Sequence, residues 1–173
     1  FIPSVERVPG ERARALGLDA DVPPYLQDIP HNTEVQPYSV EPEAYGSFLT
    51  AIFKTWVKRD VGRTYVNHFD LALAAWAGQE PPLCVYAKQC GNNVAMEHDG
   101  NVYTCDHFVY PEYLLGNVTR DSFDRMFMTP LQWGFCLAKA GRLPEDCKQC
   151  RFLSACNGGC PKHRFLTDSH GQP

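Results

Sequence analysis

The sequence predicts an α+β fold with a small, loop-rich C-terminal half. Three observations predict this class: a helix pattern over residues 42–59, a hairpin pattern over residues 94–105, and eight cysteines that all follow residue 83. Hydrophobic residues make up 44% of the 173 residues, which argues against intrinsic disorder. A net charge of −4 without a basic block argues against nucleic-acid binding, and no apolar run is long enough for a membrane span.

The N-terminal part carries one strong helix signal. Residues 1–8 are expected to end a strand, and the proline-rich residues 9–41 predict a long loop. Pro42 suits a first helical position, and Lys58 with Arg59 suits a last turn. Between them lies an apolar stripe that is expected to pack in a core rather than form a partner groove. The stripe comprises Tyr45, Phe48, Leu49, Ile52, Phe53, Trp56 and Val57.

Shorter elements are expected after residue 64. We predict a strand at 65–66, a helix over 69–77, a hairpin with its turn at 98–101, and a strand over 114–118. Asp121 is expected to cap a helix that ends at Met128. Thr129 and Pro130 are expected to begin another helix, which ends near Gly141. From Pro144 onward, glycine and cysteine predict little regular structure.

The eight cysteines admit three interpretations. Disulfides are typical of small secreted domains, but no secretory leader is visible and the core is adequate without them. Zinc sites usually combine two pairs of ligands about 15–20 residues apart. Here only five residues separate the pair at 147 and 150 from the pair at 156 and 160. Iron–sulfur clusters fit this spacing better, and a zinc-stabilised interaction module is the alternative.

The run C-x2-C-x5-C-x3-C-P over residues 147–161 resembles a bacterial ferredoxin motif with a longer middle spacer. In two-cluster ferredoxins the cysteine before proline ligates the other cluster, which here is Cys160. The first three cysteines of the run are then expected to share one cluster: Cys147, Cys150 and Cys156. Three upstream cysteines would join Cys160 on the second cluster: Cys84, Cys90 and Cys105.

The whole pattern resembles the SPASM domain of radical S-adenosylmethionine (SAM) enzymes. It reads Cys90-x9-Gly100-x4-Cys105 and then the run over residues 147–160, whereas the family has one more cysteine downstream. Cys84-x5-Cys90, Thr-Cys-Asp-His-Phe over 104–108 and Gly-Gly-Cys-Pro-Lys over 158–162 resemble anaerobic sulfatase-maturating enzymes. The SPASM likeness covers residues 64–173. Residues 1–63 resemble the last strand and helix of the preceding partial (β/α) barrel and its linking loop.

The resemblance implies two auxiliary [4Fe-4S] clusters with roles in electron transfer or structure. The first would be held by Cys84, Cys90, Cys105 and Cys160. The second would be held by Cys147, Cys150, Cys156 and a cysteine beyond residue 173, so it is incomplete here. The C-x3-C-x2-C motif of the SAM-cleaving cluster is absent, since position 163 is His163. We therefore expect a C-terminal piece of a longer enzyme, inactive alone, whose third [4Fe-4S] cluster and SAM site lie elsewhere.

The implied activity is oxidation of a Cys or Ser of a sulfatase to formylglycine. Asp106, directly after Cys105, is the candidate general base, because a family aspartate at this position has that role. An anionic cluster nearby would also raise the pKa of the carboxyl. The other interpretation is an aspartate that forms a turn or lies on the surface. A SPASM domain of a different peptide-modifying radical SAM enzyme, one that cross-links or epimerises, is an alternative function.

The implied partners are a sulfatase polypeptide, the N-terminal radical SAM barrel, and a reductant such as flavodoxin or ferredoxin. We expect a cytoplasmic location, with no nucleic acid or membrane as partner. Other side chains near the cysteines are predicted to be structural, namely His98, Tyr103, His107 and Phe108. Lys162 and Arg164 are expected at the solvated surface, and Cys136 as a non-ligand within an apolar helix.

Overall fold

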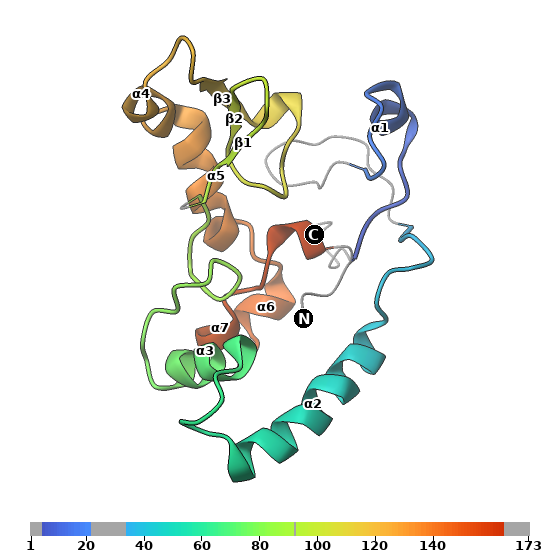
Figure 1. Ribbon diagram of the computed structural model, residues 1–173, viewed down its shortest axis with the longest axis vertical. Helices are drawn as coiled ribbons and strands as arrows, with labels where there is room; N and C mark the ends of the chain where they lie inside the picture. Colours follow the sequence, from blue (N-terminus) through green and yellow to red (C-terminus); the bar gives the residue numbers. More distant parts are fainter. Residues whose placement is uncertain (1–4, 22–33, 92, 165–173) are drawn as a thin grey trace. The chain divides into compact units, whose positions relative to one another are not determined.

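A computed structural model describes residues 5–21, 34–91 and 93–164 (Figure 1). These residues divide into two compact units, one of residues 5–21 and 34–81, the other of residues 82–91 and 93–164. Residues 1–4 of the strand expected over residues 1–8 lie outside the described residues, and residues 5–8 form only an isolated bridge at Arg7. None of the described helices combines the length and apolar character that a membrane crossing requires.

The first unit begins with an antiparallel bridge between Arg7 and Val35. Between these two residues lies the short helix α1 (Glu11–Ala15), so the prediction of a continuous loop over residues 9–41 was wrong there. The helical turn forms because it buries Ala13 completely, which a solvated loop would not do.

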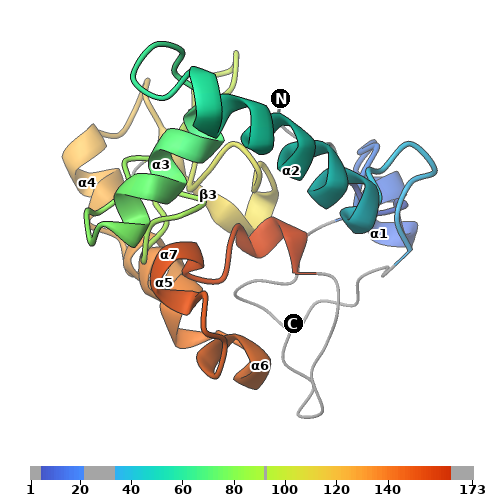
Figure 2. The same ribbon diagram turned by 90° about the horizontal axis from the view of Figure 1, so that it is seen from below.

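Helix α2 (Pro42–Arg59) has the predicted bounds, with proline in its first turn and two basic residues in its last. Only Trp56 of its apolar stripe is buried, in an aromatic cluster with Phe53 and with Phe69 of α3 (Asn67–Trp76). Phe48 is 41% exposed and Val57 46%, so the prediction that the whole stripe packs in a core was wrong for the described residues. The reason is length, since α3 lies against only part of α2 (Figure 2).

The link between these helices is not the predicted strand at 65–66. Val66 instead precedes α3 in extended conformation, and its N–H donates to Asp70 Oδ2 at 2.7 Å. That bond satisfies one of the backbone N–H groups at the start of the helix and so begins α3 two residues earlier than predicted. Gly78, with φ of 77°, ends it as expected.

The second unit contains a three-stranded antiparallel sheet in the order β1 (Ala95–Met96), β2 (Asn101–Tyr103), β3 (Leu114–Asn117). Met96 pairs with Val102, and Val102 pairs with Gly116. Both the hairpin and the third strand are confirmed. The turn requires the positive φ of 84° at Gly100, and Asn117 Nδ2 secures it with a bond to Asp99 O at 3.0 Å.

Short helices complete this unit. A 3₁₀ turn, η1 (Pro111–Tyr113), precedes β3, and α4 (Phe123–Phe127) lies against β3 and α5 (Pro130–Gly141). Thr129 caps α5 as predicted, accepting from Gln132 N. Asp121 does not cap α4, because its carboxylate accepts from Asn117 N at 2.9 Å and Ser122 holds the cap position. The cysteine-rich end forms only single turns: α6 (Glu145–Lys148), α7 (Leu153–Cys156) and η2 (Pro161–His163).

The core of the second unit is an aromatic triad. Phe108, Tyr113 and Phe135 are at most 1% exposed, and their ring centroids lie 5.0–5.9 Å apart. Cys90 and Cys105 pack against this cluster. The core therefore anchors two of the predicted metal ligands, and the expectation that Phe108 is a core residue is confirmed.

Candidate metal centre

Cys84 lies in a tight turn whose carbonyl groups point to side-chain donors. The turn is closed by a bond from Tyr86 N to Leu83 O at 2.9 Å. Lys139 Nζ of α5 donates to Cys84 O at 2.6 Å, to Val85 O at 3.1 Å and to Ala87 O at 2.5 Å. These bonds tie the first candidate ligand to the helix that carries the core residue Phe135.

Cys90 is held by the same helix one turn earlier. Its N–H donates to Cys136 O at 3.3 Å, and Gln132 Nε2 donates to Gly91 O at 2.7 Å. Gly91 has φ of 89°, and a Cβ there would meet Cys136 Sγ at 2.2 Å. The half-buried thiol of Cys136 thus packs on the backbone beside Cys90, which requires glycine at position 91.

Cys105 and Cys160 lie next to a histidine and an aspartate. Cys105 Sγ donates to Asp106 Oδ1 at 3.1 Å, and Cys160 Sγ lies 3.5 Å from His107 Nδ1. The ligand atoms of Cys105, Asp106 and His107 lie within 4.8 Å of one another. His107 was predicted to be structural, and its ring in fact lies against the candidate ligand Cys160. His98, for which the same role was predicted, is exposed in the hairpin turn.

Electrostatic influence links Cys105, Cys160 and Cys84. Burial raises the pKa of the Cys105 thiol, a backbone hydrogen bond from His107 lowers it, and the charges of Asp106 and Cys160 raise it. Burial likewise raises the pKa of Cys160, and Cys84 raises it further. Burial thus favours the protonated thiols of Cys105 and Cys160 without metal, and iron would displace these protons on binding.

The other three cysteines form a second, more exposed group: Cys147 on α6, Cys156 on α7 and Cys150 in the link between these helices. Burial raises the pKa of Cys147, the charge of Arg164 lowers it, and the charges of Cys156 and Cys150 raise it. Cys150 Sγ accepts from Phe152 N at 3.4 Å, an N–H···S bond of the kind that stabilises cluster thiolates. The crossover of Cys160 to the first group, and the ligation of both clusters, stay predictions.

Three consecutive residues in left-handed conformation connect the two groups. Asn157, Gly158 and Gly159 have φ of 49°, 76° and 64°. A Cβ at Gly158 would meet Leu143 Cδ2 at 2.2 Å, so the chain passes too close to Leu143 for any side chain there. Asn157 Nδ2 donates to Tyr86 O at 2.7 Å, which joins this segment to the turn that carries Cys84.

The residues fit an iron–sulfur cluster by their chemistry. A [4Fe-4S] cluster is held by four cysteine thiolates and needs no oxygen or nitrogen ligand. The hydroxyl of Thr104, next to Cys105, is wholly buried and makes no hydrogen bond within the described residues. A buried hydroxyl without a partner is costly, and a cluster sulfide is an acceptor of the required kind.

Two interacting side chains were not predicted from the sequence, and one was misplaced. Lys139 shares a buried face of α5 with Phe135 and Gln132, and this apolar spacing was a signal that it is not a surface lysine. Asn157 offered no such signal. Arg164 was expected at the solvated surface, but its guanidinium donates to Lys139 O and to Arg142 O, both at 3.0 Å, because these carbonyls end α5 without helical partners.

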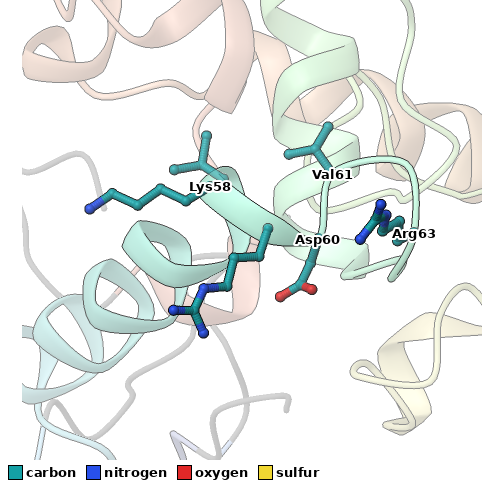
Figure 3. A pocket seen from close by; sticks show the side chains of 6 residues that line it. Lys58, Asp60, Val61 and Arg63 are labelled. Carbon is teal, nitrogen blue, oxygen red and sulfur yellow. The ribbon is translucent and has the colours of Figure 1, made fainter.

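A hollow at the C-terminal end of α2 lies in the first unit (Figure 3). Its side chains fan outward, and none is a cysteine or histidine. It is lined by Val57, Lys58, Arg59, Asp60, Val61 and Arg63. These residues offer no thiol or imidazole ligand for a cluster.

Residues 84–151 match the SPASM family, an iron–sulfur cluster-binding domain. Over this stretch the chain is similar to an iron–sulfur cluster-binding domain. More particularly, it resembles the C-terminal part of an anaerobic sulfatase-maturating enzyme, as the sequence pattern predicted.

The relatives are sulfatase-maturating enzymes of two types. The serine-type enzyme of Bacteroides thetaiotaomicron is 48% identical over 136 residues, 79% of this chain and 33% of the relative. The cysteine-type enzyme of Clostridium novyi is 29% identical over 82% of this chain and 38% of the relative. The structure of native anSMEcpe with bound AdoMet and Kp18Cys peptide matches with a TM-score of 0.67 and 27% identity, over 79% of this chain and 38% of that chain. The chain spans about a third of the length of these relatives.

Proposed function

We propose that this chain is the auxiliary-cluster part of a radical SAM enzyme that oxidises a Cys or Ser of a sulfatase to formylglycine. In this proposal four cysteines hold the first [4Fe-4S] cluster: Cys84, Cys90, Cys105 and Cys160. The observation that supports it best is that Cys105 and Cys160, distant in the sequence, meet at adjacent residues: Cys105 Sγ donates to Asp106 Oδ1 at 3.1 Å, and Cys160 Sγ lies 3.5 Å from His107 Nδ1. The charge of Cys84 also raises the pKa of Cys160. Cys90 lies near the same lysine as the others: burial lowers the pKa of Lys139, and the charges of Cys90, Cys160 and Cys84 all raise it.

The second cluster would use Cys147, Cys150 and Cys156 with a fourth ligand supplied from outside this sequence. SAM and a third [4Fe-4S] cluster would bind to the remainder of the enzyme, a radical SAM barrel whose last strand and helix correspond to residues 1–63. Residues 64–173 would form the SPASM domain. The proposed partners are a sulfatase polypeptide and a cytoplasmic reductant such as flavodoxin or ferredoxin.

Asp106 is the proposed general base. Its side chain is 73% exposed, so a substrate can reach it, and its Oδ1 lies 3.1 Å from Cys105 Sγ. Its carboxylate would take the thiol or hydroxyl proton of the substrate residue. When bound, the first cluster would supply an acceptor for one electron, and Asp106 would hold the proton beside it.

A zinc-stabilised module is the second candidate function. The observation that favours it is the mixed ligand set of Cys105, Asp106 and His107, whose atoms lie within 4.8 Å. Zinc accepts sulfur, nitrogen and oxygen ligands together, whereas [4Fe-4S] clusters require thiolates above all.

Anaerobic reconstitution with iron and sulfide separates these functions. The wild-type chain should take up both elements, as at most two clusters, and become brown. Cys105→Ser should lower the iron content, because it removes a ligand of the complete site. The matched control Cys136→Ser should leave the iron content unchanged. Tight binding of zinc alone would contradict the redox function, and equal losses from both variants would make Cys136 a ligand.

A further inference from the structure

Lys139 is a lysine without solvent exposure beside the candidate cluster. It lies on α5 with 0% exposed surface. Its ammonium reaches three carbonyl oxygens of one turn, those of Cys84, Val85 and Ala87. A lysine is rarely buried in this way unless its charge is compensated.

The hydrogen bonds indicate that Lys139 carries its charge. An ammonium has three N–H donors and no acceptor, and all three acceptors here are carbonyl oxygens. A neutral amine has only two N–H groups and would turn its lone pair toward the third oxygen. The geometry therefore fits the cation and not the amine.

No carboxylate compensates this charge among the described residues, where the ion pairs of Asp106 and Glu145 are with His107 and Lys148. Burying an ammonium without a counter-charge is strongly unfavourable even after the protein relaxes. Burial lowers the pKa of Lys139, and so does the charge of Arg164, whereas Cys90, Cys160 and Cys84 would raise it as thiolates. The missing counter-charge is thus expected where these cysteines meet.

We propose that Lys139 is the counter-cation of the cluster held by Cys84, Cys90, Cys105 and Cys160, and that it positions the turn carrying Cys84. This inference rests on the proposed function of that site. Four thiolates around a [4Fe-4S] core leave a net negative charge, and Lys139 supplies a fixed positive charge at its edge. Asn157 adds the bond to Tyr86 O, so side chains hold the carbonyls of four successive residues, 84–87.

Two consequences follow for the bound cluster. Reduction adds a negative charge, so loss of Lys139 should lower the reduction potential of the first cluster. Loss of the hydrogen bonds from Lys139 to the turn should also weaken binding of the cluster. Changes to residues that position metal ligands typically cost about 10- to 100-fold in metal affinity. A residue with a merely structural role would not move the potential of the cluster that remains bound.

The experiment compares variants of the reconstituted chain under anaerobic conditions. Lys139→Met removes the buried charge, and Lys139→Arg retains it. Lys88→Met is the matched control, because Lys88 is exposed and directly follows the same turn. The readouts are the reduction potential by optical redox titration and the rate of iron release to a chelator.

The expected result is a lower potential and about 10- to 100-fold faster iron release in Lys139→Met. Lys139→Arg should restore the potential, and Lys88→Met should match the wild type in both readouts. Lys139→Met equal to Lys88→Met would overturn the inference. If Lys139→Met does not fold, Lys139→Gln replaces it, and a wild-type potential there overturns the inference. If neither Lys139→Met nor Lys139→Gln holds iron, the test falls to Lys139→Arg. Failure of Lys139→Arg to hold iron would then also overturn the inference.

Cys105→Ser in the same series distinguishes the two proposals. Wild-type iron in Cys105→Ser means that the proposed ligand set has failed. Lower iron in Cys105→Ser together with unchanged behaviour in Lys139→Met means that only the role of Lys139 has failed.

Discussion

Asn157 should stabilise the second unit in two separable ways. It donates to Tyr86 O across 71 residues of sequence, at 2.7 Å, and it holds φ of 49° in a left-handed conformation. A hydrogen bond of this kind contributes about 1 kcal/mol, and a left-handed alanine costs about 1 kcal/mol. Asn157→Ala should therefore lower the free energy of unfolding by about 2 kcal/mol.

Asn157→Gly isolates the hydrogen bond. Glycine adopts the left-handed conformation without strain, and its greater freedom in the unfolded chain offsets that gain, so about 1 kcal/mol should be lost. For a unit of this size, each 1 kcal/mol lowers the melting temperature by about 4–8 °C.

The assay is thermal unfolding of the reconstituted chain, followed by circular dichroism without oxygen at equal iron content. The exposed Asn93→Ala serves as a control and should change stability by less than about 0.5 kcal/mol. Equal melting temperatures for Asn157→Ala and Asn157→Gly would refute the contribution of left-handed strain. A wild-type value for Asn157→Gly would refute the contribution of the bond to Tyr86.

Two further predictions concern the core and the base. Phe108→Ala should cost about 3–5 kcal/mol in the same assay, because Phe108 is 1% exposed within the aromatic triad. Phe152→Ala, at a 46% exposed site, should cost far less, and similar losses would contradict the assignment of the core. If the chain belongs to the proposed sulfatase-maturating enzyme, Asp106→Asn in that enzyme should lower formylglycine formation about 10²- to 10⁴-fold. Iron content and SAM cleavage should persist, and a wild-type rate of formylglycine formation would remove Asp106 as the base.

Local signals in the sequence were sufficient for the elements whose causes are local. Pro42 and the basic pair at 58–59 predicted the bounds of α2, and Thr129 predicted the cap of α5. The turn at 98–101 predicted the hairpin because glycine is needed at φ of 84°. Each of these features depends on residues within a few positions of one another, so sequence alone determines them.

Features that depend on distant neighbours were predicted less well. The exposed part of the α2 stripe follows from the shorter α3, whose packing no spacing reveals. Asp121 was predicted to cap a helix because aspartate is favoured at N-caps. Its carboxylate instead accepts a hydrogen bond from the backbone N–H of Asn117 at 2.9 Å. In both cases tertiary packing outweighed local preference.

The candidate site shows the same division. Cysteine spacing by itself predicted two groups of thiols and the crossover of Cys160, because a cluster demands ligands of one kind at fixed intervals. Only the tertiary structure decided what lies next to the first group: His107 against Cys160, and the ammonium of Lys139 against the carbonyl of Cys84. Lys139 is 55 residues from Cys84 in the sequence, so no local pattern predicts the bond between them. Its burial follows only from the packing of the folded chain.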